Sequence, residues 1–205
     1  MLQRKLVRAA AFALACLGAT LLAPASPRAE LAAMPAGMRG EVLMWMKDAE
    51  TKLEQLCAAM PEGKYNWRPG KGVRSVGEVY MHVAAANLGI PAMCGVQPPA
   101  GFKGAEEYEK SLTKKADIEN ALKDSFAHME QAWTSLSDAD LEKPVDLFGI
   151  KTTVRGGFLL VLSHCHEHLG QSIAYARMNG VVPPWTAKQQ AASKEQADRV
   201  KAGKK

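Results

Sequence analysis

Four stretches of about 20 residues repeat apolar side chains at the three- and four-residue spacing of an amphipathic helix. Segments with the alternating pattern of a strand are almost absent, and no internal repeat is found. The predicted helices cover residues 39–60, 75 to about 88–94, 114–136 and 157–179. Each helix must bury its apolar face against another element. The sequence therefore predicts an all-α protein built as a four-helix bundle.

The segments between these helices carry signals of their own. Ser75 and Glu78 have the spacing of a capping box, which places the start of the second helix. Asn179-Gly180 is a C-terminal helix signal. The second connector, which ends near residue 106, is long for a small bundle and is expected to border a site. Residues 141–153 predict a short β-hairpin before the last helix.

The N-terminus has the pattern of a secretory signal peptide over residues 1–29. A basic region precedes an apolar run from Ala9 to Ala23, and small residues place cleavage near residue 25 or 29. An uncleaved membrane anchor is the alternative, but the run is short for a membrane span. We expect an exported protein with no stable membrane span after cleavage. Its location would be periplasmic if the source is Gram-negative.

Charge is distributed unevenly along the chain. The formal net charge is +5, but residues 30–185 contain 16 Lys/Arg and 19 Asp/Glu. The predicted bundle, residues 30–185, is therefore slightly acidic, which argues against a nucleic-acid partner. Residues 186–205 form a lysine-rich polar segment, for which a solvated tail is favoured over a frayed helix.

Three cysteines remain after the predicted cleavage: Cys57, Cys94 and Cys165. Their odd number allows at most one disulfide within the chain, and neither a C-x-x-C nor a haem-attachment motif occurs. Cys57 and Cys94 lie in apolar helical surroundings. Buried free thiols are therefore predicted.

The last predicted helix contains three of the five histidines of the protein. His164 and His168 are four residues apart, which places their imidazoles on one helix face, roughly 6 Å apart at Cβ. Neutral imidazole is a good ligand for several divalent metals. The pair therefore predicts a metal site, whereas His166 points away from it.

His82 is the best candidate for a third ligand, because it lies on the inward face of the second helix. The alternative is a hydrogen-bonded core histidine with no ligand role. Gln171 and Tyr175 continue the face of His164 and His168, and they could orient the ligands or a bound substrate. Core packing is the competing interpretation for both. His128 lies off the apolar stripe of its helix and is predicted to be solvated.

Residues 164–168 also match the H-x-x-E-H pattern of a metalloprotease class, with Glu167 as the general base. Those enzymes are much larger and take a carboxylate ligand from far downstream. Glu195 is the only glutamate after His168, so this interpretation is rejected. No Glu-x-x-His motif of a di-iron bundle and no glycine-rich phosphate loop is present.

The chain resembles the DinB/YfiT-like superfamily of four-helix metalloproteins. The similarity lies in residues 61–69, in residues 74–84 around His82, and in the H-x-x-x-H-x-G-Q helix at residues 164–171, which is followed by a glycine and a proline pair. It spans residues 40–185 and identifies the bundle as DinB-like.

This resemblance implies a divalent metal held by His82, His164 and His168, with open coordination positions, and frequently a homodimer. Zinc is the first expectation, with nickel, iron or manganese as alternatives. Characterised relatives include transferases and isomerases that use bacillithiol or mycothiol. This chain departs from the family pattern at Leu169, where relatives often have arginine. That departure and the predicted export both argue against chemistry with those cytosolic thiols.

Three functional hypotheses follow. The first is a metal-dependent enzyme of the hydrolase or thiol-dependent transferase type, which uses the three-histidine site on an unidentified small-molecule substrate. The second is a non-catalytic envelope protein that binds metal at the same site or uses it for stability. The third is a structural bundle without metal. A metal closed off by a fourth protein ligand, such as Glu78 or Cys165, would favour the second.

Overall fold

The computed structural model describes residues 37–203. Four long helices form the body: α2 (Gly37–Ala59), α3 (Val76–Met93), α5 (Lys115–Ser135) and α7 (Val154–Met178). The shorter elements are η1 (Glu62–Lys64), α4 (Ala105–Glu109), α6 (Asp138–Leu141), β1 (Pro144–Leu147) and β2 (Ile150–Thr153), and α8 (Pro184–Ala202) ends the described chain. The predicted all-α four-helix bundle with a hairpin before its last helix is confirmed.

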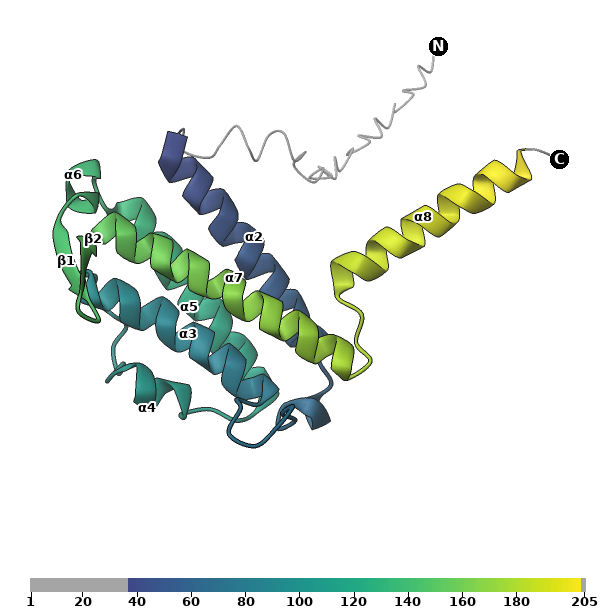
Figure 1. Cartoon of the computed structure of the whole chain (residues 1–205), viewed down its shortest axis with the longest axis horizontal. Helices are drawn as coiled ribbons and strands as arrows, with labels where there is room; N and C mark the ends of the chain where they lie inside the picture. The colour runs from purple at the N-terminus through teal and green to yellow at the C-terminus, as the bar shows by residue number, and fades with distance from the viewer. Residues whose placement is uncertain (1–36, 204–205) are drawn as a thin grey trace, which may run out of the picture. The chain divides into compact units, whose positions relative to one another are not determined.

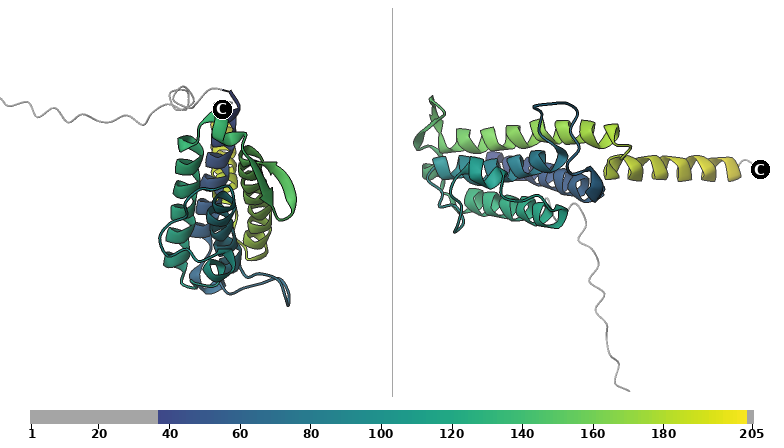
Figure 2. Two further views of the ribbon diagram at one scale, coloured as in Figure 1. Left: turned by 90° about the vertical axis from the view of Figure 1, so that its left-hand side faces the viewer. Right: turned by 90° about the horizontal axis from the view of Figure 1, so that it is seen from below.

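The order of the helices in the bundle differs from their order in the chain. Both α2 and α3 pack against α5 and against α7. The consecutive helices α2 and α3 therefore occupy opposite corners, and α7 lies alongside both of them (Figure 1). The two views of Figure 2 show the four long helices side by side with closely aligned axes.

The interior is built from the apolar stripes expected from the sequence. The α2 stripe of Met46, Ala49, Leu53, Leu56 and Met60 is completely buried. It meets the stripe of α5, in which Leu122, Phe126, Met129 and Trp133 are also buried. Each large apolar side chain removed from water contributes about 1.5–3 kcal/mol to folding. These stripes determine which faces of α2 and α5 are inward.

Helix ends follow the predicted caps with small shifts. The Ser75 side chain accepts from the backbone N–H of Glu78, and Glu78 accepts from the N–H of Ser75 at 2.7 Å, which completes the capping box. Helix α7 begins three residues earlier than expected, because the Thr153 hydroxyl caps it by accepting from the N–H of Gly156. Gly180, at a φ of 74°, follows its end.

The hairpin pairs β1 and β2 in antiparallel register, with Leu147 opposite Ile150. Its two-residue turn consists of Phe148 (φ 56°) and Gly149 (φ 85°). Positive φ at both central positions matches a type I′ turn, which suits the twist of a hairpin. Asp146 supports the turn by accepting from the N–H of Gly149 at 2.8 Å. A bulky residue at positive φ is strained, and Phe148 is the only non-glycine example among the described residues.

The expectation of a solvated tail after residue 185 was wrong about its conformation. Residues Pro184–Ala202 form α8, although none of them is buried. Proline at the helix start, a run of good helix-forming residues and two i,i+4 ion pairs, Lys194–Asp198 and Glu195–Arg199, explain the helix. The segment is thus solvated but helical.

The predicted signal peptide, residues 1–29, lies outside the described residues and stays a prediction. Across residues 37–203, no helix combines the length and the apolar content that a membrane crossing requires. Cys57, Cys94 and Cys165 are buried free thiols, as predicted.

Candidate metal centre

The structure brings together the three histidines that the sequence singled out. His82 lies on α3, and His164 and His168 lie one turn apart on α7. One nitrogen from each ring can be chosen so that all three atoms lie within 4.8 Å of one another. The ring centroids are 4.4–4.9 Å apart. Packing of α3 against α7 completes the three-imidazole cluster, although its metal-binding role stays a prediction.

One pair of ring nitrogens, from His82 and His164, has the spacing of ligands to a shared metal ion. Nε2 of His164 is 3.1 Å from Nε2 of His82. Two nitrogens bound at 2.0–2.1 Å to one tetrahedral ion would lie about 3.3 Å apart. The observed separation is therefore close to the spacing that a shared ion requires.

A carboxylate from α4 orients His82. Glu109 Oε2 lies 2.7 Å from His82 Nδ1, and Glu109 Oε1 accepts from Arg74 Nε at 2.5 Å. Burial raises the pKa of Glu109, but the hydrogen bonds from Arg74 and His82 outweigh it and hold the pKa below its ordinary value. An ionised Glu109 accepts the Nδ1–H proton of His82 and leaves Nε2 free for a ligand role.

The side chains of Gln171 and Tyr175 orient His168, as Glu109 orients His82. Gln171 Oε1 lies 2.7 Å from His168 Nδ1, and Gln171 Nε2 donates to the Tyr175 hydroxyl at 3.0 Å. Tyr175 donates in turn to the backbone carbonyl of Arg74 at 3.2 Å. This geometry supports the ligand-orienting role predicted for Gln171 and Tyr175. Arg74 anchors both arrangements, one through its carbonyl and the other through its guanidinium group.

His164 differs from its two partners. Its Nδ1 is buried and has no hydrogen-bond partner within residues 37–203. Burial, followed by the proximity of His168 and His82, lowers the pKa of His164 to about 4. Burial also lowers the pKa of His168, against the opposing effect of Gln171. Both imidazoles are therefore neutral near pH 7, which is the form that binds metal.

The other histidines lie outside the cluster. His166 points away, as predicted, with its Nδ1 3.0 Å from the Leu162 carbonyl and its ring against the edge of Trp45. The prediction that His128 is solvated was wrong. It is half-buried, with a buried Nε2, and this burial lowers its pKa. A position beside the apolar stripe of α5 is therefore partly buried rather than solvated.

Neither proposed fourth ligand reaches the cluster. Glu78 is occupied by the N-cap and by an ion pair with Arg68 at 3.0 Å. Cys165 is buried and donates to the Asn87 side chain at 3.3 Å, and burial raises its pKa to about 12. The described donor group therefore consists of the three histidines.

Sequence reasoning missed Glu109 and Arg74. For Glu109 the available signal was the length of the second connector, which was expected to border a site; Arg74 lies in the connector before α3. The segment between α3 and α5 contains the unpredicted helix α4, which begins inside this connector and extends past its expected end near residue 106. Helix α4 lies against α3 (Figure 1). His82 and His164 also line one wall of a cavity of about 690 Å³ whose remaining lining comes from this connector, the hairpin, α3 and α7.

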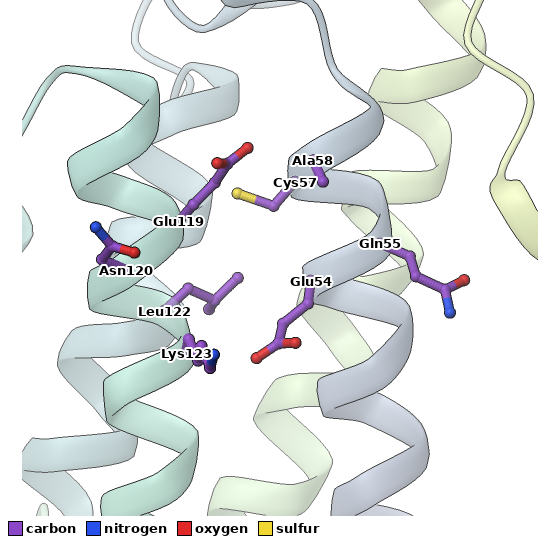
Figure 3. Close-up of a pocket in the computed structure, with 8 residues that line it drawn as sticks. All are labelled: Glu54, Gln55, Cys57, Ala58, Glu119, Asn120, Leu122 and Lys123. Carbon is purple, nitrogen blue, oxygen red and sulfur yellow. The ribbon is translucent and has the colours of Figure 1, made fainter. Parts of the chain in front are cut away.

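A second cavity, of about 320 Å³, lies between α2 and α5 (Figure 3). Glu54, Glu119 and Lys123 face it, together with Cys57. Burial raises the pKa of Cys57 to about 12, and its sulfur lies 3.2 Å from the Tyr65 hydroxyl, so the thiol is protonated and unreactive. None of the three clustered histidines lines this cavity.

Comparison with known proteins supports the resemblance. A family model described as the DinB superfamily matches residues 46–172. A DinB-like protein from Bacillus cereus has 17% identity and a TM-score of 0.63, over 72% of this chain and 95% of that chain. YfiT from Bacillus subtilis is also similar, with 13% identity and a TM-score of 0.56 over 72% of this chain and 91% of YfiT. It is described as a probable metal-dependent hydrolase with an unusual four-helix bundle topology.

A mycothiol-dependent maleylpyruvate isomerase is also similar, with 14% identity and a TM-score of 0.53, over 68% of this chain and 61% of the isomerase. A search of curated proteins finds no match. At these identities the solved structures establish the fold alone.

Proposed function

The chain belongs to the DinB superfamily, and we propose that it is a metal-dependent enzyme whose site is formed by His82, His164 and His168. The observation that carries this proposal is the convergence of three imidazole nitrogens within 4.8 Å of one another. Zinc is the first candidate for the ion, with nickel, iron or manganese as alternatives.

The surroundings of the cluster support an enzyme more than a closed structural site. Structural zinc sites have four protein ligands, whereas catalytic sites have three and keep one position open. Glu78 and Cys165 are held by other partners, and His82 and His164 border a cavity. A small molecule could therefore approach the site from the cavity.

The residues of the chain would bind the metal ion and orient its ligands. His82 and His168 each present Nε2 to the site, because Glu109 and Gln171 engage the opposite ring nitrogens. His164 is kept neutral by burial. A bound divalent ion supplies Lewis-acid chemistry, which polarises a carbonyl group or activates a nucleophile. We infer a hydrolase as the first reaction type.

Thiol-dependent transfer is the second candidate reaction. It is motivated by the similarity in fold to a mycothiol-dependent isomerase. The predicted export, which rests on residues 1–29, disfavours it because cytosolic thiols would be absent. Sequencing the N-terminus of the mature protein tests export: an N-terminus near residue 26 or 30 is expected, and a retained Met1 would contradict it.

Elemental analysis of the purified protein tests the site. We expect one divalent ion per chain, lost in His82→Ala and in His168→Ala. His166→Ala and His128→Ala serve as matched controls, because those histidines lie outside the cluster, and both should retain metal. If His82→Ala keeps the metal content and affinity of the unaltered chain, the proposed site is wrong.

Hydrolysis is tested separately with soluble short-chain esters and amides. The metal-loaded protein should turn over at least one of them, and chelation should abolish the activity. If the metal is bound but held without exchange, and no hydrolysis or thiol transfer is detected, the non-catalytic alternative is supported.

A further inference from the structure

The cavity beside the histidines follows one face of α3. His82, Ala85, Ala86, Gly89, Ile90 and Met93 line it. Their spacing of three and four residues makes a continuous stripe roughly 16 Å long, at a rise of about 1.5 Å per residue. Three of these positions carry small residues, Ala85, Ala86 and Gly89, and Phe102 and Ala105 lie opposite Gly89. The cavity is thus an elongated groove that begins at His82.

The other walls are also apolar. Leu160 of α7, Phe102 of the second connector, and Phe148 and Ile150 of the hairpin all line the groove. The polar side chains along it are those of His82, His164, Glu106 and Glu109. Glu106 lies at the rim and forms an ion pair with Lys110. Glu109 contacts His82, so most of the polar groups lie at the histidine end.

The hairpin presents two apolar side chains to solvent at an energetic cost. Phe148 is 72% exposed and Ile150 is 68% exposed. Phe148 also occupies the strained conformation at a φ of 56°. Exposed apolar groups that gather on a concave surface are typical of a ligand site, and strained residues concentrate at such sites.

We propose that this groove binds the hydrocarbon portion of an amphiphilic small-molecule substrate and directs its polar, reactive end to His82 and His164. The volume of about 690 Å³ falls within the range of small-molecule sites, and an apolar cleft with a few converging polar groups is their usual composition. The continuity of the groove with the histidine cluster favours a substrate over a protein partner. The assignment of a reaction to this ligand rests on the proposed function.

Binding of the neutral fluorescent probe N-phenyl-1-naphthylamine tests the groove. The probe should bind the metal-free and the zinc-loaded protein, and 1-decanol should displace it at lower concentration than 1-butanol. Ala86→Phe fills the groove and should weaken probe binding by about tenfold or more. Ala127→Phe, the same change at an exposed position of α5 outside the groove, is the matched control and should bind like the unaltered chain.

A second pair of variants guards against misfolding of Ala86→Phe. Phe148→Ser with Ile150→Ser removes exposed side chains, so the bundle should keep its circular dichroism and thermal transition. Leu159→Ser with Val182→Ser removes two exposed side chains that do not line the groove. Weaker probe binding is expected only in the hairpin variant. Equal binding by both double variants and by the unaltered chain would overturn the proposal.

The outcomes separate this inference from the proposed function. Probe binding by metal-free protein requires neither metal nor turnover, so the groove assignment stands if hydrolysis is not found. Hydrolysis of a short ester by protein that does not bind the probe would leave the enzyme proposal in place and overturn the groove. Probe affinity that falls as protein concentration rises would mean that a second copy of the chain fills the groove, which also overturns the proposal.

Discussion

Replacement of Glu109 by glutamine should weaken metal binding without unfolding the bundle. The variant removes a charge-assisted hydrogen bond to His82 Nδ1 at 2.7 Å and turns an amide toward Arg74, which held the carboxylate at 2.5 Å. A hydrogen bond to a charged group contributes about 1.5–3 kcal/mol. Loss of a residue that orients a metal ligand typically costs about 10- to 100-fold in affinity. The Glu109 and His82 side chains are 20% and 24% exposed, which favours the lower part of that range. We therefore expect Glu109→Gln to bind zinc about tenfold more weakly, a loss of about 1.4 kcal/mol.

The measurement is a competition titration of zinc against a chromophoric chelator at pH 7. Glu107→Gln is the matched control, because Glu107 lies on the same short helix and, within residues 37–203, its side chain pairs only with the exposed Lys103. Such a surface pair contributes about 0–1 kcal/mol, so its loss should leave zinc affinity unchanged. Urea unfolding of the metal-free variants checks that both remain folded. If the affinity of Glu109→Gln equals that of Glu107→Gln, Glu109 does not orient a metal ligand and the reasoning fails.

Three further predictions concern stability. Ser75→Ala removes the N-cap that Glu78 completes and should lower the free energy of unfolding by about 1 kcal/mol. Urea unfolding measures this change, and an unchanged free energy would contradict the capping assignment. Gly157→Ala should lower the free energy of unfolding by about 1–3 kcal/mol, because the added Cβ would lie 2.3 Å from Cys94 Sγ. The double variant with Cys94→Ala should recover part of this loss. If the losses of the two single variants simply add in the double variant, the contact is refuted. Burial and a hydrogen bond with Glu130 raise the pKa of Glu50 from 4.5 to about 7. The folded state then binds the proton more tightly than the unfolded chain, so the contribution of Glu50 is complete below pH 4.5 and is lost as the pH rises through about 7. Urea unfolding at several pH values should show this decline in the unaltered chain, and an equal decline in Glu50→Gln would assign it to another group.

The sequence was sufficient for the four long helices and for the choice of the three clustered histidines because both inferences depend on local periodicity. Met46, Leu53 and Leu56 repeat at helical spacing, and that spacing determines which face of α2 is buried. The same phase argument placed His164 and His168 on one face and excluded His166. His82 followed because its position on an inward face leaves few partners other than those two rings.

The position of α4 could not be predicted from local pattern. Its five residues, Ala105–Glu109, are too few for a stable isolated helix. Contacts that lie far apart in the sequence, such as that between Arg74 and Glu109, hold it against α3. The diagonal arrangement of α2 and α3 is a tertiary property of the same kind. In α8, by contrast, helix-forming residues and local ion pairs were present, and the sequence interpretation gave too much weight to the absence of an apolar face.

Packing of α3 against α7 brings the three imidazoles together, but it does not determine their orientation. The orientation of His82 depends on Glu109 and the Arg74 guanidinium, and that of His168 depends on Gln171, Tyr175 and the Arg74 carbonyl. Arg74 directly precedes the N-cap of α3, so both arrangements end at the residue that leads into this helix. A displacement of the helix entry would therefore turn two of the three rings together. His164 has no such support, and its orientation depends on burial and on its neighbouring rings. The site is thus a property of the connectors as much as of the bundle, which explains why a helical pattern alone identifies the candidate ligands but not the groups that orient them.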